Sequence, residues 1–107
     1  MQLIDAIFLV SQMSENAVIC AREPFVWGSE AVIAQLTDDY GVPEDVKAQG
    51  YAYFLEKEGV VELLEMISGK RASRETKAEF VCHYATHDAY PSWLEDLPNE
   101  SNPNAKP

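Results

Sequence analysis

Apolar residues at helical spacing predict a helix at the start of the chain. They recur before Ser14, with Asp5 and Gln12 on the other side of the helix. The apolar positions are Leu3, Ile4, Ile7, Phe8 and Val10. The run Ser14-Glu15-Asn16 interrupts the pattern, so we expect the helix to end there.

Two short apolar runs, 17–21 and 31–36, predict β-strands. Pro24 and Gly28 lie in the sequence REPFVWGSE between them, where they suit a long hairpin loop. Runs this short fit a buried helix as well as a strand. We choose strands because the proline and the glycine isolate the two runs.

Proline and glycine divide the segment 43–68 into three elements. Pro43 suits the first position of a short helix, and Gly50 suits the left-handed residue after its end. The aromatic run 51–55 then predicts a third strand. A single helix over the whole segment is the alternative, and each internal glycine would cost it about 1 kcal/mol.

Two longer helices follow in the pattern. The first covers 56–68 and is closed by Gly69. Its apolar face consists of Val60, Leu63, Leu64 and Ile67. The second begins at the cap Ser73 and ends at or before Tyr90, because Pro91 follows. Its inward side carries Phe80, Val81 and Tyr84.

These elements predict an α+β fold, a small antiparallel sheet of about three strands with about four packed helices. At 107 residues the chain suits one domain, which we place at 1–97. Trp93, Leu94 and Leu97 are expected to fold back onto it. The polar, proline-containing stretch 98–107 is typical of a flexible C-terminal tail.

Acidic residues dominate the charge, with 18 Asp and Glu against 8 Lys and Arg and a net charge of −10. This balance argues against direct binding to nucleic acid, whose phosphates attract Lys and Arg. It favours fast capture of a basic protein instead. The stretch KRASRETK at 70–77 is the local exception, with four bases and one acid.

Neither a membrane span nor a signal peptide is predicted. No apolar run approaches the roughly 20 residues that a spanning helix needs. The apolar start lacks a basic lead and contains Asp5. Cys20 and Cys82 are too few for a disulfide framework, and we expect them to be buried thiols in a reducing compartment. We therefore expect a cytoplasmic protein.

The last helix gathers residue types that occur in metal and catalytic sites. His83 and His87 lie four residues apart, a spacing at which two imidazoles can share a metal ion. Only Cys20 or a distant carboxylate remains as a further ligand, so we predict neither a metal site nor a cofactor. Cys82 diverges from His83 by about 100° on a helix, which separates a thiol from a catalytic base.

No motif in the sequence assigns a reaction, because a glycine-rich phosphate loop and a Gly-x-Ser-x-Gly elbow are both absent. We predict no catalytic residue and no enzyme. Asp88 falls on the same side of the last helix as Phe80 and Tyr84. A carboxylate there needs polar partners, so we expect it to bond backbone amides of a nearby loop.

Three glutamates form a stripe on the predicted helix 56–68. Glu58, Glu62 and Glu65 occupy positions i, i+4 and i+7, which share one face. Like charges at this spacing cost about 0.2–0.5 kcal/mol each, and no base stands four residues beyond the first two. Asp38 and Asp39 begin a second acidic group.

We predict these five carboxylates as the contacts for a basic protein partner. Two alternatives remain open. The stripe is a solvated helix face without a partner, or the bases of 70–77 pair with it inside the molecule.

Several short motifs resemble those of a small bacterial domain family of unknown function, over most of residues 17–94. The matching positions are Pro43, Gly50, the Val-Val-x-Leu-Leu pattern from Val60 to Leu64, Tyr84, and Asp88-Ala89-Tyr90. By analogy of size and charge, small acidic domains of this kind occur as immunity proteins beside bacterial toxins, including those of contact-dependent inhibition systems. The resemblance implies a protein partner.

The hypothesis from sequence is a monomeric immunity protein that binds and neutralises a basic toxin, with a nuclease as the candidate. One alternative is a nucleic-acid mimic that inhibits a defence enzyme. Another is a small regulator that dimerises through the side of the last helix formed by Ala78, Cys82 and Ala85.

Overall fold

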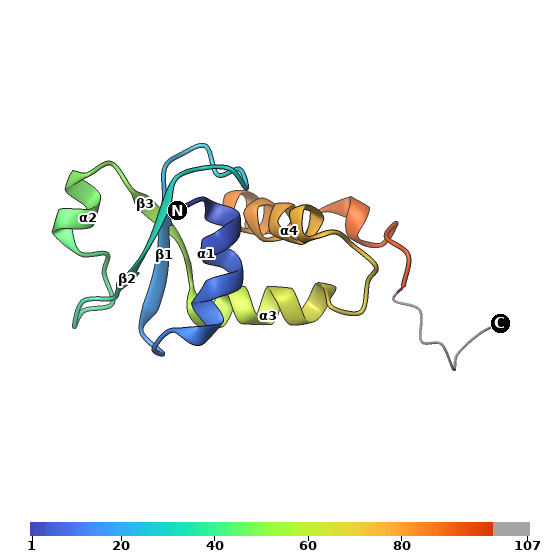
Figure 1. The fold of residues 1–107 in the computed structure, drawn as a ribbon, viewed down its shortest axis with the longest axis horizontal. Coiled ribbons are helices and arrows are strands. Elements are labelled where there is room, and N and C mark those ends of the chain that lie inside the picture. Colours follow the sequence, from blue (N-terminus) through green and yellow to red (C-terminus); the bar gives the residue numbers. More distant parts are fainter. Residues whose placement is uncertain (100–107) are drawn as a thin grey trace.

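A three-stranded antiparallel sheet forms the centre of the structure, a computed structural model that describes residues 1–99 of the chain (Figure 1). The strands lie in the order β2-β1-β3, with β1 in the middle. Their bounds are Ala17–Ala21 for β1, Ala31–Gln35 for β2 and Ala52–Glu56 for β3. Both apolar runs and the aromatic run are therefore strands, as predicted.

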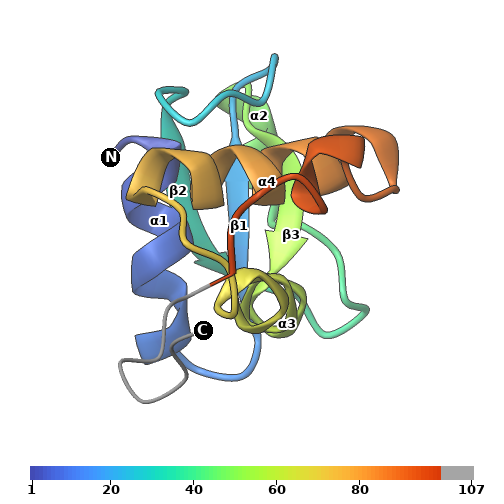
Figure 2. The same ribbon diagram turned by 90° about the vertical axis from the view of Figure 1, so that its right-hand side faces the viewer.

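Four helices accompany the sheet. Their bounds are Leu3–Leu9 for α1, Glu44–Ala48 for α2, Lys57–Ile67 for α3 and Arg74–His87 for α4. Short 3₁₀ turns follow at Val10–Gln12 (η1) and Ser92–Leu94 (η2). Viewed along the long axis, α1, α3 and α4 lie in front of the sheet and α2 lies behind it (Figure 2). The predicted α+β class is confirmed.

The alternative of one helix over 43–68 is wrong, because a strand separates α2 from α3. Gly50 is the reason the chain turns there. It has a φ of +90°, a conformation that side-chain-bearing residues rarely adopt. A Cβ at this position would also lie 2.6 Å from Nη1 of Arg22.

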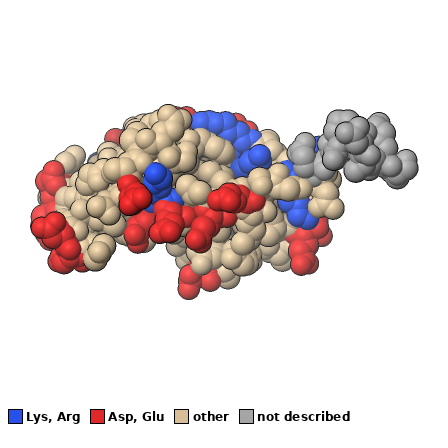
Figure 3. Space-filling model, turned by 90° about the horizontal axis from the view of Figure 1, so that it is seen from below, with Lys and Arg blue, Asp and Glu red and all other residues tan. Residues whose placement is uncertain are grey.

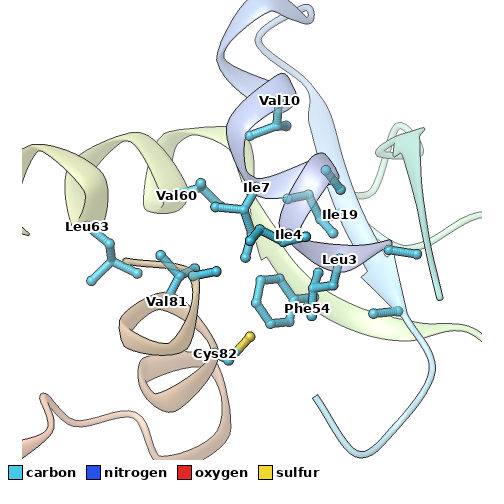
Figure 4. Packing of buried hydrophobic residues seen from close by; sticks show 14 of the residues in the cluster. Leu3, Ile4, Ile7, Val10, Ile19, Phe54, Val60, Leu63, Val81 and Cys82 are labelled. Carbon is cyan, nitrogen blue, oxygen red and sulfur yellow. The ribbon is translucent and has the colours of Figure 1, made fainter. Parts of the chain in front are cut away.

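The main hydrophobic core lies between the sheet and the three helices in front of it (Figure 4). Helices α1 and α3 contribute the apolar sides that their spacing predicts, whereas α4 buries Ala78 and Cys82 and leaves Tyr84 only partly buried. α1 and η1 supply Leu3, Ile4, Ile7 and Val10, α3 supplies Val60, Leu63 and Ile67, and α4 supplies Ala78, Phe80, Val81 and Cys82. Ile19 of β1 and Phe54 of β3 face these helices.

A smaller cluster covers the opposite face of β1. Val18 and Cys20 pack there against Val42 and Tyr51, which flank α2. All five residues of β1 are consequently fully buried. This double burial explains why β1 reads as a continuous apolar run, with no polar residue at alternate positions.

A β-bulge shapes the edge strand β3. Ile19 pairs with Leu55 and Cys20 pairs with Tyr53, so Phe54 has no partner residue on β1. Its ring is 2% exposed and meets Phe25 edge-on, with ring centres 5.1 Å apart. The bulge thus brings the largest side chain of β3 into the core.

The β1–β2 loop, residues 22–30, caps the start of α1. The first amides of a helix have no partner within it. Here the amide of Leu3 donates to the Ser29 carbonyl at 2.7 Å, and that of Ile4 donates to the Trp27 carbonyl at 2.9 Å. The loop is therefore held across the top of the domain beside α4 (Figure 1).

The start of α4 is as predicted from the sequence, and its end differs from the prediction. Ser73 caps the helix as predicted, since its Oγ accepts a hydrogen bond from the Thr76 amide at 3.1 Å. The expectation for Asp88 is wrong. The helix ends at His87, and Asp88 adopts the left-handed conformation with an exposed side chain.

The segment after α4 returns to the domain, as predicted. Trp93, Leu94 and Leu97 pack against the main core. The ring of Tyr90 stacks on that of Phe80, with ring centres 6.2 Å apart. The Pro98 carbonyl accepts a hydrogen bond from the Arg71 amide at 2.7 Å. Of the predicted flexible tail 98–107, residues 100–107 lie outside the described part, so that prediction stays a prediction.

The described helices were compared with the length and apolarity that a membrane-spanning helix needs. Within residues 1–99, no helix is both long enough and apolar enough to cross a bilayer.

Neighbouring residues of β3 provide a test of this core. Phe54→Ala should lower the free energy of unfolding by about 3–5 kcal/mol, because it leaves a cavity in the main core where the buried ring had been. Tyr53 points to the other face and is 46% exposed. Tyr53→Ala should cost about 1 kcal/mol, the span of strand propensity. Urea denaturation of both variants measures the difference, and equal losses would contradict the described packing.

Candidate functional site

The outer face of α3 carries the predicted acidic stripe. Val60, Leu63 and Ile67 are buried beneath the helix. Glu58, Glu62 and Glu65 lie away from these residues and are all exposed. From below, acidic side chains form a band over α3 and a second group at the end of the molecule where α2 lies (Figure 3).

The second predicted group lies in the turn after β2. Asp38 and Asp39 are both exposed. The Thr37 hydroxyl donates a hydrogen bond to the Asp39 carboxylate and accepts one from the Gly41 amide at 3.0 Å. The bond from Thr37 is the main cause that lowers the pKa of Asp39 below its usual value. This carboxylate is therefore held ionised and in a defined position.

A hollow of about 480 Å³ lies between these two acidic groups. Glu58 of the stripe and Tyr40 of the turn both line it, and Tyr40 is 79% exposed. Glu15 and Glu56 add further carboxylates to its wall. Of the five predicted residues only Glu58 lines this acidic hollow, which long-range folding assembles and which no local sequence signal reveals.

Lys57 also lines this hollow, but its ammonium group is engaged in a hydrogen bond within the protein. Its Nζ donates to the Met13 carbonyl at 2.7 Å. Because that carbonyl lies at the end of η1, the ammonium group ties α3 to η1.

The ion pairs within residues 1–99 leave the stripe unpaired. Arg74 pairs with Asp5 of α1 at 3.2 Å and lies over the Phe8 ring at 4.8 Å. Lys47 pairs with Glu44 at 3.7 Å inside α2. Neither pair includes a predicted contact residue. The alternative that the 70–77 bases neutralise the stripe is therefore not realised by Arg74, which binds α1 instead.

A second hollow, a groove of about 620 Å³, lies between α4 and the β1–β2 loop. Aromatic rings come from both the loop and the segment after α4, namely Phe25, Trp27 and Trp93. Helix α4 contributes Glu79, Cys82, His83, Ala85, Thr86 and His87. Trp27 is 37% exposed and Val26 is 54% exposed. The groove thus combines apolar surface with two imidazoles.

The two histidines lie together in this groove. Their ring centres are 4.5 Å apart. Nδ1 of His83 is 3.1 Å from the Ala89 carbonyl oxygen. In the part of the chain that the structure describes, no group of three or more His, Cys, Asp or Glu side chains is arranged to hold a metal ion.

The Cys82 thiol borders the groove without being an activated nucleophile. Burial, with a smaller contribution from Glu79, raises its pKa to about 12. A nucleophilic cysteine needs the opposite shift, because the thiolate is the reactive form. Ala78 and Cys82 also pack into the main core, so of the side suggested for dimerisation only Ala85 is partly exposed.

Comparison with known proteins adds no assignment. No protein family, no curated protein and no solved structure matches this chain. The functional interpretation therefore depends on the site itself.

The inert state of Cys82 can be measured. With a pKa of about 12, about one thiol in 10⁴ is ionised at pH 8. In a Cys20→Ala background, alkylation of Cys82 by iodoacetamide should be at least about a hundredfold slower in buffer than in urea, where the thiol regains its ordinary pKa near 8.5. Mass spectrometry of timed samples follows the reaction. Equal rates in both conditions would show that the thiol is exposed and ionisable in the folded protein.

Proposed function

We propose that this protein is an immunity protein that binds a basic toxin through the acidic surface of α3 and the 37–41 turn. The observation that supports it most is the exposed row of Glu58, Glu62 and Glu65, which has no ion-pair partner within residues 1–99. Like charges held side by side cost folding free energy. A basic partner would turn this cost into attraction.

The shape of the surface supports a nuclease as the partner. The active site of a nuclease binds phosphates through Lys and Arg, and carboxylates can occupy the same positions. Glu15, Glu56 and Glu58 surround a hollow beside the exposed Tyr40. Tyrosine is among the residues that contribute most to protein interfaces, so Tyr40 would be an apolar anchor within an acidic rim.

The proposed setting is the cytoplasm, where an immunity protein meets its toxin. The resemblance to small acidic bacterial domains agrees with this role. The net charge of −10 would accelerate encounter with a basic protein by electrostatic steering. The protein itself would carry out no reaction.

The direct test is a pull-down with the product of the neighbouring gene, at low and at high salt. The expected result is specific capture at low salt that weakens as salt rises, because salt screens exposed charges. Candidate partners without a basic domain serve as controls. Failure to capture any of a full set of neighbouring gene products in either condition would overturn the proposal.

A matched pair of triple variants tests which face binds. In Glu58→Gln/Glu62→Gln/Glu65→Gln, association with the partner should slow by roughly tenfold or more at low salt. In Glu75→Gln/Glu95→Gln/Asp96→Asn, the net charge changes equally at exposed sites outside the stripe. There the rate should fall by about twofold or less. Stopped-flow mixing measures both rates, and equal slowing would mean that net charge rather than the stripe steers binding.

A further inference from the structure

The groove between α4 and the β1–β2 loop holds a pair of imidazoles that the proposed toxin binding does not use. His83 and His87 stand one helical turn apart, and both line the groove. Their rings are tilted by 46° with centres 4.5 Å apart. Residues four apart on a helix project from the same side, so the two rings converge on one region of space.

The tautomer of His83 is set by its hydrogen bond. The Ala89 carbonyl oxygen can only accept, so the Nδ1 atom at 3.1 Å must carry the hydrogen. Nε2 of the neutral ring then keeps its lone pair. Histidines that ligate metals nearly always donate their other ring nitrogen to a carbonyl or carboxylate in this way, which orients the ring and raises its basicity.

The end of α4 supplies this orienting carbonyl. Asp88 adopts a left-handed conformation with φ of 52°, which turns the chain back after the helix. The carbonyl of the next residue, Ala89, thereby reaches the side chain of His83, six residues earlier in the chain. The left-handed backbone of Asp88 therefore places the carbonyl that orients the His83 ring, whereas the Asp88 side chain is exposed.

The separation of the rings fits a shared ion. Suppose that one dication is bound by both Nε2 atoms at about 2.0–2.1 Å. The two ring centres then lie roughly 4.5–5.2 Å apart as the Nε2–metal–Nε2 angle goes from about 90° to the tetrahedral value. The observed 4.5 Å lies within this range. Binding would therefore require rotation of side chains and no change in the helix.

We propose that His83 and His87 bind one first-row transition-metal dication of the imidazole-binding class, such as Zn²⁺, Ni²⁺ or Cu²⁺. Water fills the remaining coordination positions on the open side of the groove. Glu79 lines the groove one turn before His83 and is exposed, but within residues 1–99 no third His, Cys, Asp or Glu side chain is arranged to hold an ion together with the pair. The pair alone gives an open site that a third ligand can complete.

The test uses the full chain without an affinity tag, because a histidine tag would bind the same ions. Titration calorimetry with Cu²⁺, Ni²⁺ and Zn²⁺ should show one ion per chain. His87→Ala, at an exposed position, should weaken binding by roughly tenfold or more. Thr86→Ala changes the adjacent groove residue and should leave the affinity unchanged. Circular dichroism establishes that each variant is folded.

A spectroscopic readout identifies the ligands. The electron paramagnetic resonance spectrum of the Cu²⁺-loaded protein should show coupling to two imidazole nitrogens, and His83→Ala should reduce this to one. Trp27 and Trp93 line the same groove, so Cu²⁺ should also quench tryptophan fluorescence. Binding weaker than about 1 mM for all three ions would overturn the proposal. Equal affinity in the wild type and in His83→Ala/His87→Ala would overturn it too, since the ion would then lie elsewhere.

Discussion

The burial of β1 on both faces is the constraint on which the rest of the structure depends. All five of its residues are fully buried. One face needs the three helices α1, α3 and α4, and the other needs the segment around α2. Burying a large aliphatic side chain contributes about 1.5–3 kcal/mol, and β1 places one on each face, Ile19 in the main core and Val18 in the smaller cluster. Each of the elements that cover β1 must therefore turn its apolar side chains toward the strand.

The acidic surface follows from that constraint. Because Val60, Leu63 and Ile67 face the core, Glu58, Glu62 and Glu65 on the other side of α3 face solvent. The Lys57 ammonium ties the start of α3 to η1, and Arg74 at the start of α4 pairs with Asp5 of α1. Lys57 and Arg74 are thus engaged in holding helices together. The glutamates of the stripe are left exposed and outside both ion pairs found within residues 1–99, which is the basis of the proposal that a basic partner docks there.

Local signals in the sequence were enough to predict the helices and strands. The groove beside α4 was missed because it depends on long-range contacts. Gly50 and Ser73 act through their own backbone neighbourhood, so the turn and the cap are confirmed. The groove could not be predicted, because it exists only once the β1–β2 loop caps α1 and is thereby placed beside α4. Asp88 was misjudged because ideal helical geometry was extended one residue past the true end of the helix.

The central claim is that the outer face of α3, with the neighbouring 37–41 turn, is the docking surface. Amide chemical-shift mapping of the ¹⁵N-labelled protein during titration with its partner tests it most directly. The largest shifts should fall on Glu58, Glu62 and Glu65 and on Asp38 to Tyr40, with little change along α4. Shifts concentrated on the groove between α4 and the β1–β2 loop, with α3 unchanged, would contradict the claim.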